Sequence, residues 1–208
     1  MNILICGVGG QGIILTSRLI AAAAMTKDIP IMSAETIGMA QKGGSVFSFL
    51  RLGDSQEALV PSQAHGSAAF ASANVLYSPM FARGAADMII AFEPSEAVRM
   101  LPYLGPDGRL IVNSHPIMPP TAALAGSNYD GREMLDYLKR NVKHLSVVDG
   151  DAACRAVGSA KALNMVMLGA AVQSGALPLS VDEVEAVMRQ TVKPQFHDMN
   201  SRALRYRF

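Results

Sequence analysis

Short apolar runs of strand length recur along the chain and alternate with segments that have helical spacing. Runs of this kind predict strands that are buried on both faces of a sheet. The predicted strands are Asn2–Cys6, Ile29–Ala34, Ser45–Leu52, Met88–Phe92, Arg109–Asn113 and Ser146–Val148. Because strands that alternate with helices form parallel sheets covered on both faces, we expect a three-layer α/β/α domain with a mostly parallel, Rossmann-like sheet.

Helical spacing predicts helices over Ile13–Ala24 and Pro94–Leu104, and further helices toward the end of the chain. Ser180 opens the last of them as a capping box with the glutamate three residues later. The segment Ala160–Ser174 is apolar on nearly every side, and such a helix is buried on nearly every side. This helix is either a core helix of the domain or part of a subunit interface. The loop around Met39 is the other candidate for such an interface, and in either case the isolated chain is expected to form homo-oligomers.

The composition excludes several classes of protein. The 208 residues are 50% hydrophobic and 17% charged, with a formal net charge of +1. A balanced charge argues against binding of nucleic acid. The two long uncharged stretches contain too many polar residues for a membrane span, and no secretory leader opens the chain, so the expected compartment is the cytoplasm. Two cysteines cannot form a four-cysteine cluster or zinc site, so no metal site is expected on this chain alone.

A glycine motif follows the first predicted strand. Gly7, Gly9 and Gly12 match G-x-G-x-x-G and open a helix, where glycines let the backbone approach an anion beside free N–H groups. Glu35 ends the next predicted strand, where dinucleotide-binding proteins carry an acid that binds the ribose. Spacing alone leaves two interpretations open. One is a nucleotide site in a stand-alone NAD(P)-binding dehydrogenase, and the other is tight packing of strand on helix.

Polar residues follow several other predicted strands directly, namely Glu93, Asn113 and Asp149. Ligands bind at the carboxyl edge of open parallel sheets. Strand ends are also polar because they meet water, and for any single residue this second explanation is favoured. The histidines are scattered, and we find no nucleophile elbow, no Walker loop and no H-E-x-x-H motif. No catalytic residue is therefore assigned, and a binding chain is favoured over a self-sufficient enzyme.

The glycine motif and several later segments together resemble one protein family. The chain is similar to the gamma subunit of 2-oxoacid:ferredoxin oxidoreductases, and most similar to the small (beta) subunit of indolepyruvate ferredoxin oxidoreductase. The resemblance covers almost the whole chain. The segments that carry it are Gly7–Gly12 (GVGGQG), Ala34–Val46 (AETIGMAQKGGSV), Ala91–Pro94 (AFEP), Ile111–Asn113 (IVN) and Asn164–Ala170 (NMVMLGA).

The resemblance implies a non-redox subunit of an enzyme that oxidatively decarboxylates 2-oxoacids to acyl-CoA. The substrates implied are indolepyruvate, other aryl pyruvates or pyruvate-like acids. Thiamine diphosphate and iron–sulfur clusters are expected on larger partner subunits, coenzyme A in the assembled complex, and no cofactor on this chain alone. The chain meets ferredoxin only indirectly and is inactive by itself. Residues 1–208 form one domain of this type, in which residues 54–77 are an insertion relative to the family.

The resemblance also disfavours a bound NAD, because the family uses its glycine loop without a dinucleotide. Lys42 stands where relatives carry arginine. A lysine beside glycines at the carboxyl edge suits contact with an anion, either the oxoacid carboxylate or a phosphate of thiamine diphosphate or coenzyme A. Its ammonium group is a point charge, so it cannot form the paired hydrogen bonds of a planar arginine guanidinium. A tight turn with a solvated lysine is the alternative. The candidate cofactor-binding residues are Gly7, Gly9, Gly10, Gln11, Gly12, Glu35, Gln41, Lys42, Gly43 and Gly44.

Overall fold

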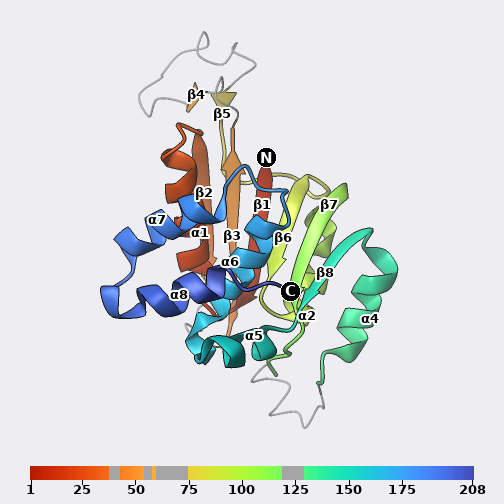
Figure 1. Cartoon of the computed structure of the whole chain (residues 1–208). Coiled ribbons are helices and arrows are strands. Elements are labelled where there is room, and N and C mark those ends of the chain that lie inside the picture. Colours follow the sequence, from red (N-terminus) through yellow and green to blue (C-terminus); the bar gives the residue numbers. More distant parts are fainter. Residues whose placement is uncertain (38–42, 54–57, 60–74, 119–128) are drawn as a thin grey trace.

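A six-stranded sheet lies in the middle of the molecule, with helices on both faces (Figure 1). The computed structural model describes residues 1–37, 43–53, 58–59, 75–118 and 129–208. Continuous apolar runs form the central strands because both faces of the sheet are covered. The strands are β1 (Asn2–Val8), β2 (Ile31–Ile37), β3 (Ser45–Leu52), β6 (Ala86–Ala91), β7 (Leu104–Asn113) and β8 (His144–Val148), with a separate short pair, β4 (Ala58–Leu59) and β5 (Val75–Leu76).

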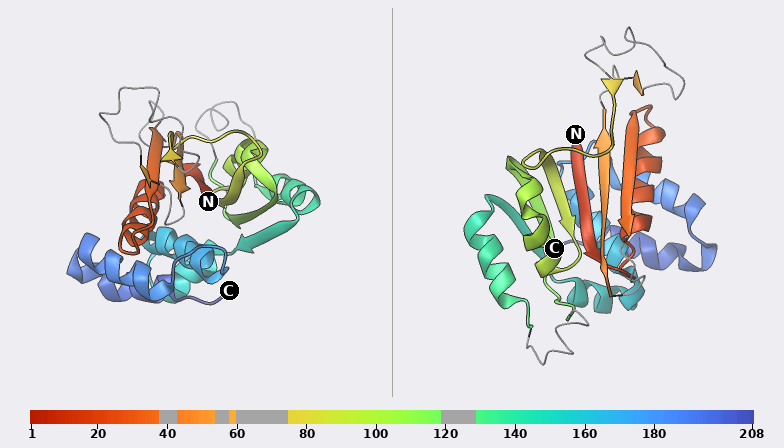
Figure 2. Two further views of the ribbon diagram at one scale, coloured as in Figure 1. Left: turned by 90° about the horizontal axis from the view of Figure 1, so that it is seen from above. Right: turned by 180° about the vertical axis from the view of Figure 1, so that it is seen from behind.

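The helices form two layers of unequal size. Helices α1, α5, α6, α7 and α8 cover one face of the sheet, and α2 and α4 cover the other (Figure 2). Strand β1 alternates between them, with Ile3 and Ile5 in the larger core and Leu4 and Cys6 in the smaller one. The helices are α1 (Ile13–Met25), α2 (Pro94–Met100), α4 (Arg132–Asn141), α5 (Gly150–Val157), α6 (Leu163–Gln173), α7 (Val181–Thr191) and α8 (His197–Leu204).

The sheet is mostly parallel, as predicted, but one strand interrupts it. The strand order is β2-β3-β1-β6-β7-β8, and β3 pairs antiparallel with both β1 and β2. Strands β1, β6, β7 and β8 pair parallel to one another. The expectation that Glu35 ends its strand is wrong, because β2 continues to Ile37. The first parallel pair of a dinucleotide-binding fold is therefore absent from this sheet, since β3 separates β1 from β2.

The predicted helices form with shifted ends. Helix α2 stops at Met100 and becomes a 3-10 turn, Leu101–Tyr103, because Pro102 lacks the N–H that would continue the helix. Ser180 and Glu183 form the expected capping box of α7. Most of the stretch predicted to be an insertion lies outside the described residues, as do Met39, Gln41 and Lys42. No helix in the described ranges has the length and hydropathy that a membrane crossing requires.

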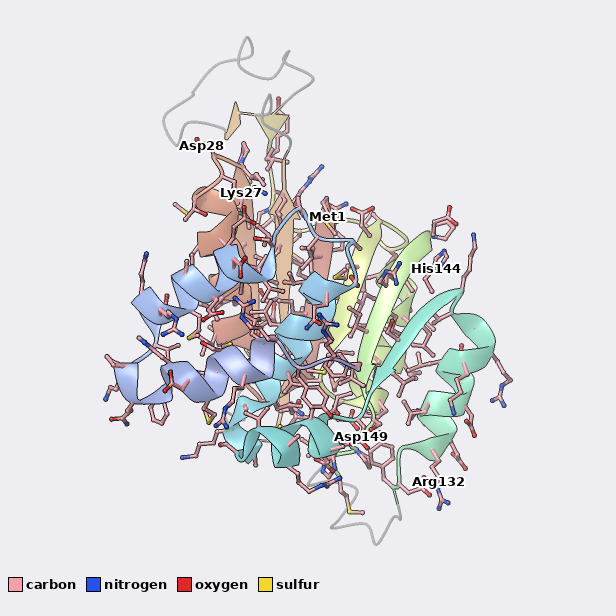
Figure 3. All side chains as sticks on the ribbon, viewed as in Figure 1. Met1, Lys27, Asp28, Arg132, His144 and Asp149 are labelled. Atoms are coloured by element: carbon pink, nitrogen blue, oxygen red, sulfur yellow. The ribbon has the colours of Figure 1, made fainter. Side chains whose placement is uncertain are left out.

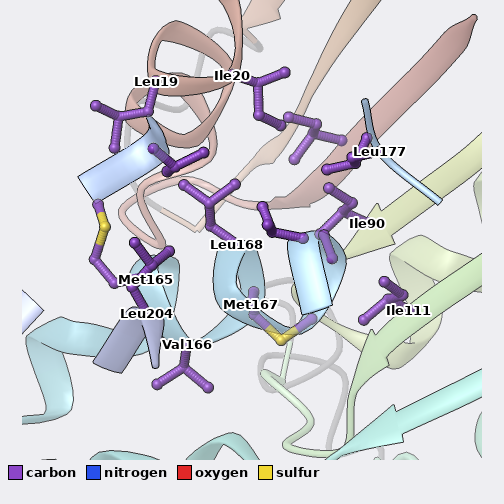
Figure 4. Packing of buried hydrophobic residues seen from close by; sticks show 14 of the residues in the cluster. Leu19, Ile20, Ile90, Ile111, Met165, Val166, Met167, Leu168, Leu177 and Leu204 are labelled. Carbon is purple, nitrogen blue, oxygen red and sulfur yellow. The ribbon is translucent and has the colours of Figure 1, made fainter. Parts of the chain in front are cut away.

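Helix α6 packs in the core of this domain, which is the first of the two predicted alternatives. Met165, Val166, Met167 and Leu168 are fully buried by the chain itself. Figure 4 shows these side chains packed among those of α1, α8 and the sheet. An apolar helix without a polar face is stable in this position because helices lie against several of its sides. Self-association of the isolated chain therefore finds no support in the exposure of α6.

The sharpest packing constraint is the contact between α6 and α8. A Cβ placed on Gly169 would lie 2.3 Å from the carbonyl oxygen of Leu204, which is backbone and cannot rotate away. We therefore expect Gly169→Ala to lower the free energy of unfolding by about 1–3 kcal/mol. Helix propensity alone predicts the opposite sign, since alanine favours a helix by about 1 kcal/mol over glycine.

Urea denaturation followed by circular dichroism measures this change. Ala186→Gly, at an exposed position of α7, is the matched control for the propensity effect, with an expected loss of about 1 kcal/mol. A Gly169→Ala chain that is more stable than the wild type would contradict the close packing of α8 on α6.

Candidate functional site

The loops that follow β1, β6, β7 and β8 meet at the carboxyl edge of the sheet. In Figure 3, Met1 lies at one end of the sheet and Asp149 at the other, and the carboxyl edge is the end at Asp149. Asp149 caps α5, with its carboxylate 2.9 Å from the backbone N of Ala152. Gly44 belongs to the same edge, because its carbonyl oxygen accepts a hydrogen bond from Gly9 N at 2.8 Å. The two glycine motifs are therefore adjacent in space.

One backbone carbonyl connects three of these loops. The carbonyl oxygen of Phe92, at the end of β6, accepts hydrogen bonds from Nε2 of Gln11 at 2.9 Å and from Nδ2 of Asn113 at 3.2 Å. The Oδ1 atom of Asn113 in turn accepts from Gly150 N at 3.1 Å. Asn113 is 1% exposed, so its polarity serves this network and not contact with water. The favoured explanation for the polar strand ends is therefore wrong at Asn113.

The side chain of Gln11 fills the space inside the glycine loop. Its Oε1 atom accepts a hydrogen bond from Val8 N at 2.7 Å, while its Nε2 reaches Phe92. Gly7 makes this possible, since a Cβ there would lie 2.6 Å from the same Oε1 atom. The loop is thus closed by its own glutamine, and Gly7 serves tight packing.

Two further glycines of the loop have left-handed backbone. Gly12 has a φ of +86° and packs against Asn164 of α6. A Cβ added to Gly12 would lie only 2.9 Å from the Cβ of Asn164. Gly10 has a φ of +104°, and in the described part of the chain nothing lies within 4 Å of a Cβ built on it. Gly10 is therefore an exposed residue of the loop that no described side chain fills.

The structure does not bring Glu35 next to the glycine loop. Glu35 pairs with Ser48 of β3, and Ser48 pairs with Ile5 of β1. Strands lie about 4.8 Å apart, so roughly 10 Å separates the backbones of β2 and β1. A ribose bound at the loop would therefore not meet Glu35. The sequence pattern does not reveal this, because the order of strands in the chain does not show that β3 inserts between β1 and β2.

A fully buried carboxylate lies beside this network. Glu93 caps α2 through Glu96 N at 3.0 Å and also accepts from Ile117 N at 3.3 Å and from the hydroxyl of Tyr129 at 2.6 Å. Burial, together with the hydrogen bond to Glu93, raises the pKa of Tyr129, so this hydroxyl stays protonated and donates. Glu93 is thus solvated by neutral donors from three segments. Spacing gave no signal for Tyr129, which lies 36 residues later.

A charged cluster on the α2 side borders the same edge. Ser45 donates to Glu96 at 2.7 Å, and Arg99 donates to both side chains. The guanidinium of Arg99 also lies over the ring of Phe47, 5.7 Å from its centre. These residues hold the start of β3 against α2, directly after Gly43 and Gly44.

The cysteines do not form a reactive or metal-binding site. Burial raises the pKa of the Cys6 thiol, which lies 3.7 Å from the carbonyl of Glu96, and burial also raises the pKa of Cys154. Both are therefore neutral thiols at pH 7. Across the described ranges, no group of three or more histidine, cysteine or acidic side chains is placed to hold a metal ion. His115 pairs with Asp151 at 2.7 Å on the surface of this edge.

Comparison with known proteins identifies the family. Residues 2–206 match the family described as pyruvate ferredoxin/flavodoxin oxidoreductase. The chain belongs to this family. It is 34% identical over 205 residues to the indolepyruvate oxidoreductase subunit IorB of Methanothermobacter thermautotrophicus. That alignment covers 98% of this chain and 94% of the relative. It is 32% identical over 206 residues to IorB of Archaeoglobus fulgidus, covering 99% and 92%.

The fold of this pyruvate ferredoxin/flavodoxin oxidoreductase family member has a solved counterpart. The pyruvate oxidoreductase subunit PORC of Thermotoga maritima superposes with a TM-score of 0.64 at 22% identity, covering 99% of this chain and 93% of that one. The resemblance inferred from the two glycine motifs and the α/β fold class are both confirmed. Because the relatives are subunits, this family member has partner subunits.

Removal of the Gln11 amide tests the closed loop. We expect Gln11→Ala to lower the free energy of unfolding by about 1–3 kcal/mol, because the N–H of Val8 loses its partner in a partly buried place. Hydrogen exchange at the Val8 amide should accelerate in parallel. Gln190→Ala, an exposed position of α7, is the control and should change stability by less than about 0.5 kcal/mol. Unchanged exchange at Val8 would show that the glutamine does not close the loop.

Proposed function

We propose that this chain is the non-redox subunit of a thiamine diphosphate-dependent 2-oxoacid:ferredoxin oxidoreductase that acts on indolepyruvate and related aryl pyruvates. The observation that carries the proposal is the family match over residues 2–206, together with IorB relatives of nearly the same length. The assembled enzyme would oxidatively decarboxylate the 2-oxoacid to acyl-CoA in the cytoplasm. The chain alone is inactive.

The chemistry of the described side chains supports this division of labour. Thiamine diphosphate supplies the carbanion chemistry when bound, and we assign it and the clusters to the larger subunit, which also meets ferredoxin. Cys6 and Cys154 are neutral, buried thiols on different elements. They do not suit cluster ligation, which needs several thiolates converging on one point. This chain contributes shape and hydrogen-bond donors at its carboxyl edge.

We assign contact with an anion to the two glycine motifs. Gly10 presents open backbone with a φ of +104°, and Gly43 has a φ of +79°. The hydrogen bond from Gly9 to Gly44 holds the two segments together. Lys42 and Gln41 precede Gly43 directly in the sequence. Backbone N–H groups at this edge, with a lysine next in the sequence, suit the oxoacid carboxylate or a phosphate of coenzyme A, presented across the subunit boundary.

The alternative of a stand-alone NAD(P) dehydrogenase has no such support. Gln11 fills the loop that a pyrophosphate would approach, and β3 separates Glu35 from it. We therefore expect calorimetric titration of the chain with NAD and NADP to give no binding heat. Binding of either dinucleotide at micromolar concentration would favour the dehydrogenase instead.

Reconstitution tests the proposal directly. The chain is co-expressed with the thiamine-bearing subunit of the same enzyme, and reduction of ferredoxin by indolepyruvate is followed in the presence of coenzyme A. We expect activity only when both subunits are present. An active larger subunit with unchanged kinetics in the absence of this chain would overturn the proposal.

Lys42→Ala separates an anion contact from a solvated turn. In the assembled enzyme we expect the KM for the oxoacid or for coenzyme A to rise about tenfold, the effect of roughly 1.4 kcal/mol of lost binding. Stability should change by less than about 0.5 kcal/mol. Lys193→Ala, at an exposed lysine that follows α7, is the control and should leave both KM values unchanged. Kinetics of Lys42→Ala that equal those of the control would leave only the turn.

A further inference from the structure

A hollow lies away from the glycine motifs, over the β8 end of the sheet. It has a volume of about 350 Å³ and opens on the side of the sheet that α6 covers. Arg109 of β7, Ser146 of β8, Gln173 of α6 and the final residues Arg207 and Phe208 line it. No aspartate or glutamate side chain belongs to this lining, whereas two arginine side chains do.

The two arginines of this hollow lack partners. In the described part of the chain the side chains of Arg109 and Arg207 make no hydrogen bond or ion pair, whereas those of Arg99, Arg189 and Arg205 are all paired with carboxylates. Arg109 is half-buried on a strand with a neighbour on each side, and its guanidinium has no carboxylate partner in the described part of the chain. A guanidinium in such a place favours a planar anion that accepts two hydrogen bonds.

The tail that carries Arg207 is held over the hollow by a specific contact. The Nε2 atom of Gln173 donates to the carbonyl of Leu204 at 3.0 Å and to that of Tyr206 at 2.9 Å. The rings of Tyr206 and Phe208 also meet edge to face, with centres 5.3 Å apart. Figure 1 shows the C-terminal end lying in front of β7 and β8. The charge of Arg207 is thus positioned beside that of Arg109 by the fold.

The hollow borders an open strand edge. Strand β8 is the last in the order of the sheet, so one of its edges pairs with no strand of the described chain. Val147 is 42% exposed there, and Phe208 is 60% exposed beside it. An unpaired edge with arginine and aromatic side chains is typical of a surface that receives an extended segment of another protein.

We propose that an extended, acidic segment of the larger partner subunit adds to β8 as a further strand and places a carboxylate between Arg109 and Arg207. The inference rests on the proposed function for the existence of that subunit. A small anion would use the two arginines but not the edge of β8, Val147 or Phe208. A protein segment uses all of them, which is why the geometry favours it.

Charge reversal at the exposed arginine tests the docking site. The chain is purified with its larger subunit, and the dissociation constant is measured at two salt concentrations for the wild type, Arg207→Glu and Arg109→Gln. We expect each variant to bind at least tenfold more weakly and to show a smaller loss of affinity with salt, because an interfacial ion pair is gone. Arg207 is exposed, so Arg207→Glu keeps the proposal testable if Arg109→Gln fails to fold.

Two controls separate this surface from others. Arg18→Glu changes an exposed, unpaired arginine of α1, at the opposite end of the sheet, and should bind like the wild type. Hydrogen exchange at the amides of Leu145 and Val147, which alternate with those facing β7, should slow in the wild-type complex and remain fast in the free chain. Affinity of Arg207→Glu equal to that of Arg18→Glu, with no protection of these amides, would overturn the proposal.

The remaining outcomes are also decisive. Titration of the free chain with sodium acetate or inorganic phosphate tests for a small-anion site. If the chain binds either anion saturably, and Arg207→Glu abolishes that binding but leaves assembly unaffected, docking of a protein segment is overturned. A wild-type chain that forms no complex with the larger subunit contradicts the proposed function itself. Intact assembly of the wild type and of both variants alike contradicts only the docking site.

Discussion

The carbonyl oxygen of Phe92 is the point on which the carboxyl edge depends. It accepts two amide donors, Gln11 from the loop after β1 and Asn113 from the end of β7, and Asn113 passes the connection on to Gly150. In both donors the amide oxygen also accepts a hydrogen bond, from Val8 N in Gln11 and from Gly150 N in Asn113. The loops are therefore held in one arrangement by paired hydrogen bonds at partly buried positions. Such a network costs stability if any member is removed, because the remaining groups are left without water or partners.

This network changes the meaning of the glycine motif. In a dinucleotide-binding fold the glycines leave space for a pyrophosphate, whereas Gly7 leaves space for Gln11 and Gly12 leaves space for Asn164. Strand β3 adds a second difference, because it occupies the place next to β1 that a parallel strand would take. The same spacing thus serves the packing of a rigid edge at Gly7 and Gly12, whereas Gly10 is exposed.

The molecule presents two regions of different character to its surroundings. The carboxyl edge is held by hydrogen bonds from neutral donors to buried Glu93, which fix its loops in one arrangement. The β8 side has an unpaired edge and two arginines without partners, Arg109 and Arg207. One region is thus held by internal hydrogen bonds, and the other has groups that the described chain leaves unpaired.

The sequence alone determined the strands, the α/β class and the family, because continuous apolar runs and linked glycine motifs are local signals. It also determined that α6 is buried, though not by what, since an apolar helix has the same pattern in a core and in an interface. Only the tertiary structure decided that β3 inserts between β1 and β2, that Glu35 stands apart from the loop, and that Tyr129 reaches Glu93. These depend on contacts between residues distant in the chain, and hydrogen-bond partners of that kind leave no periodic trace in a single sequence.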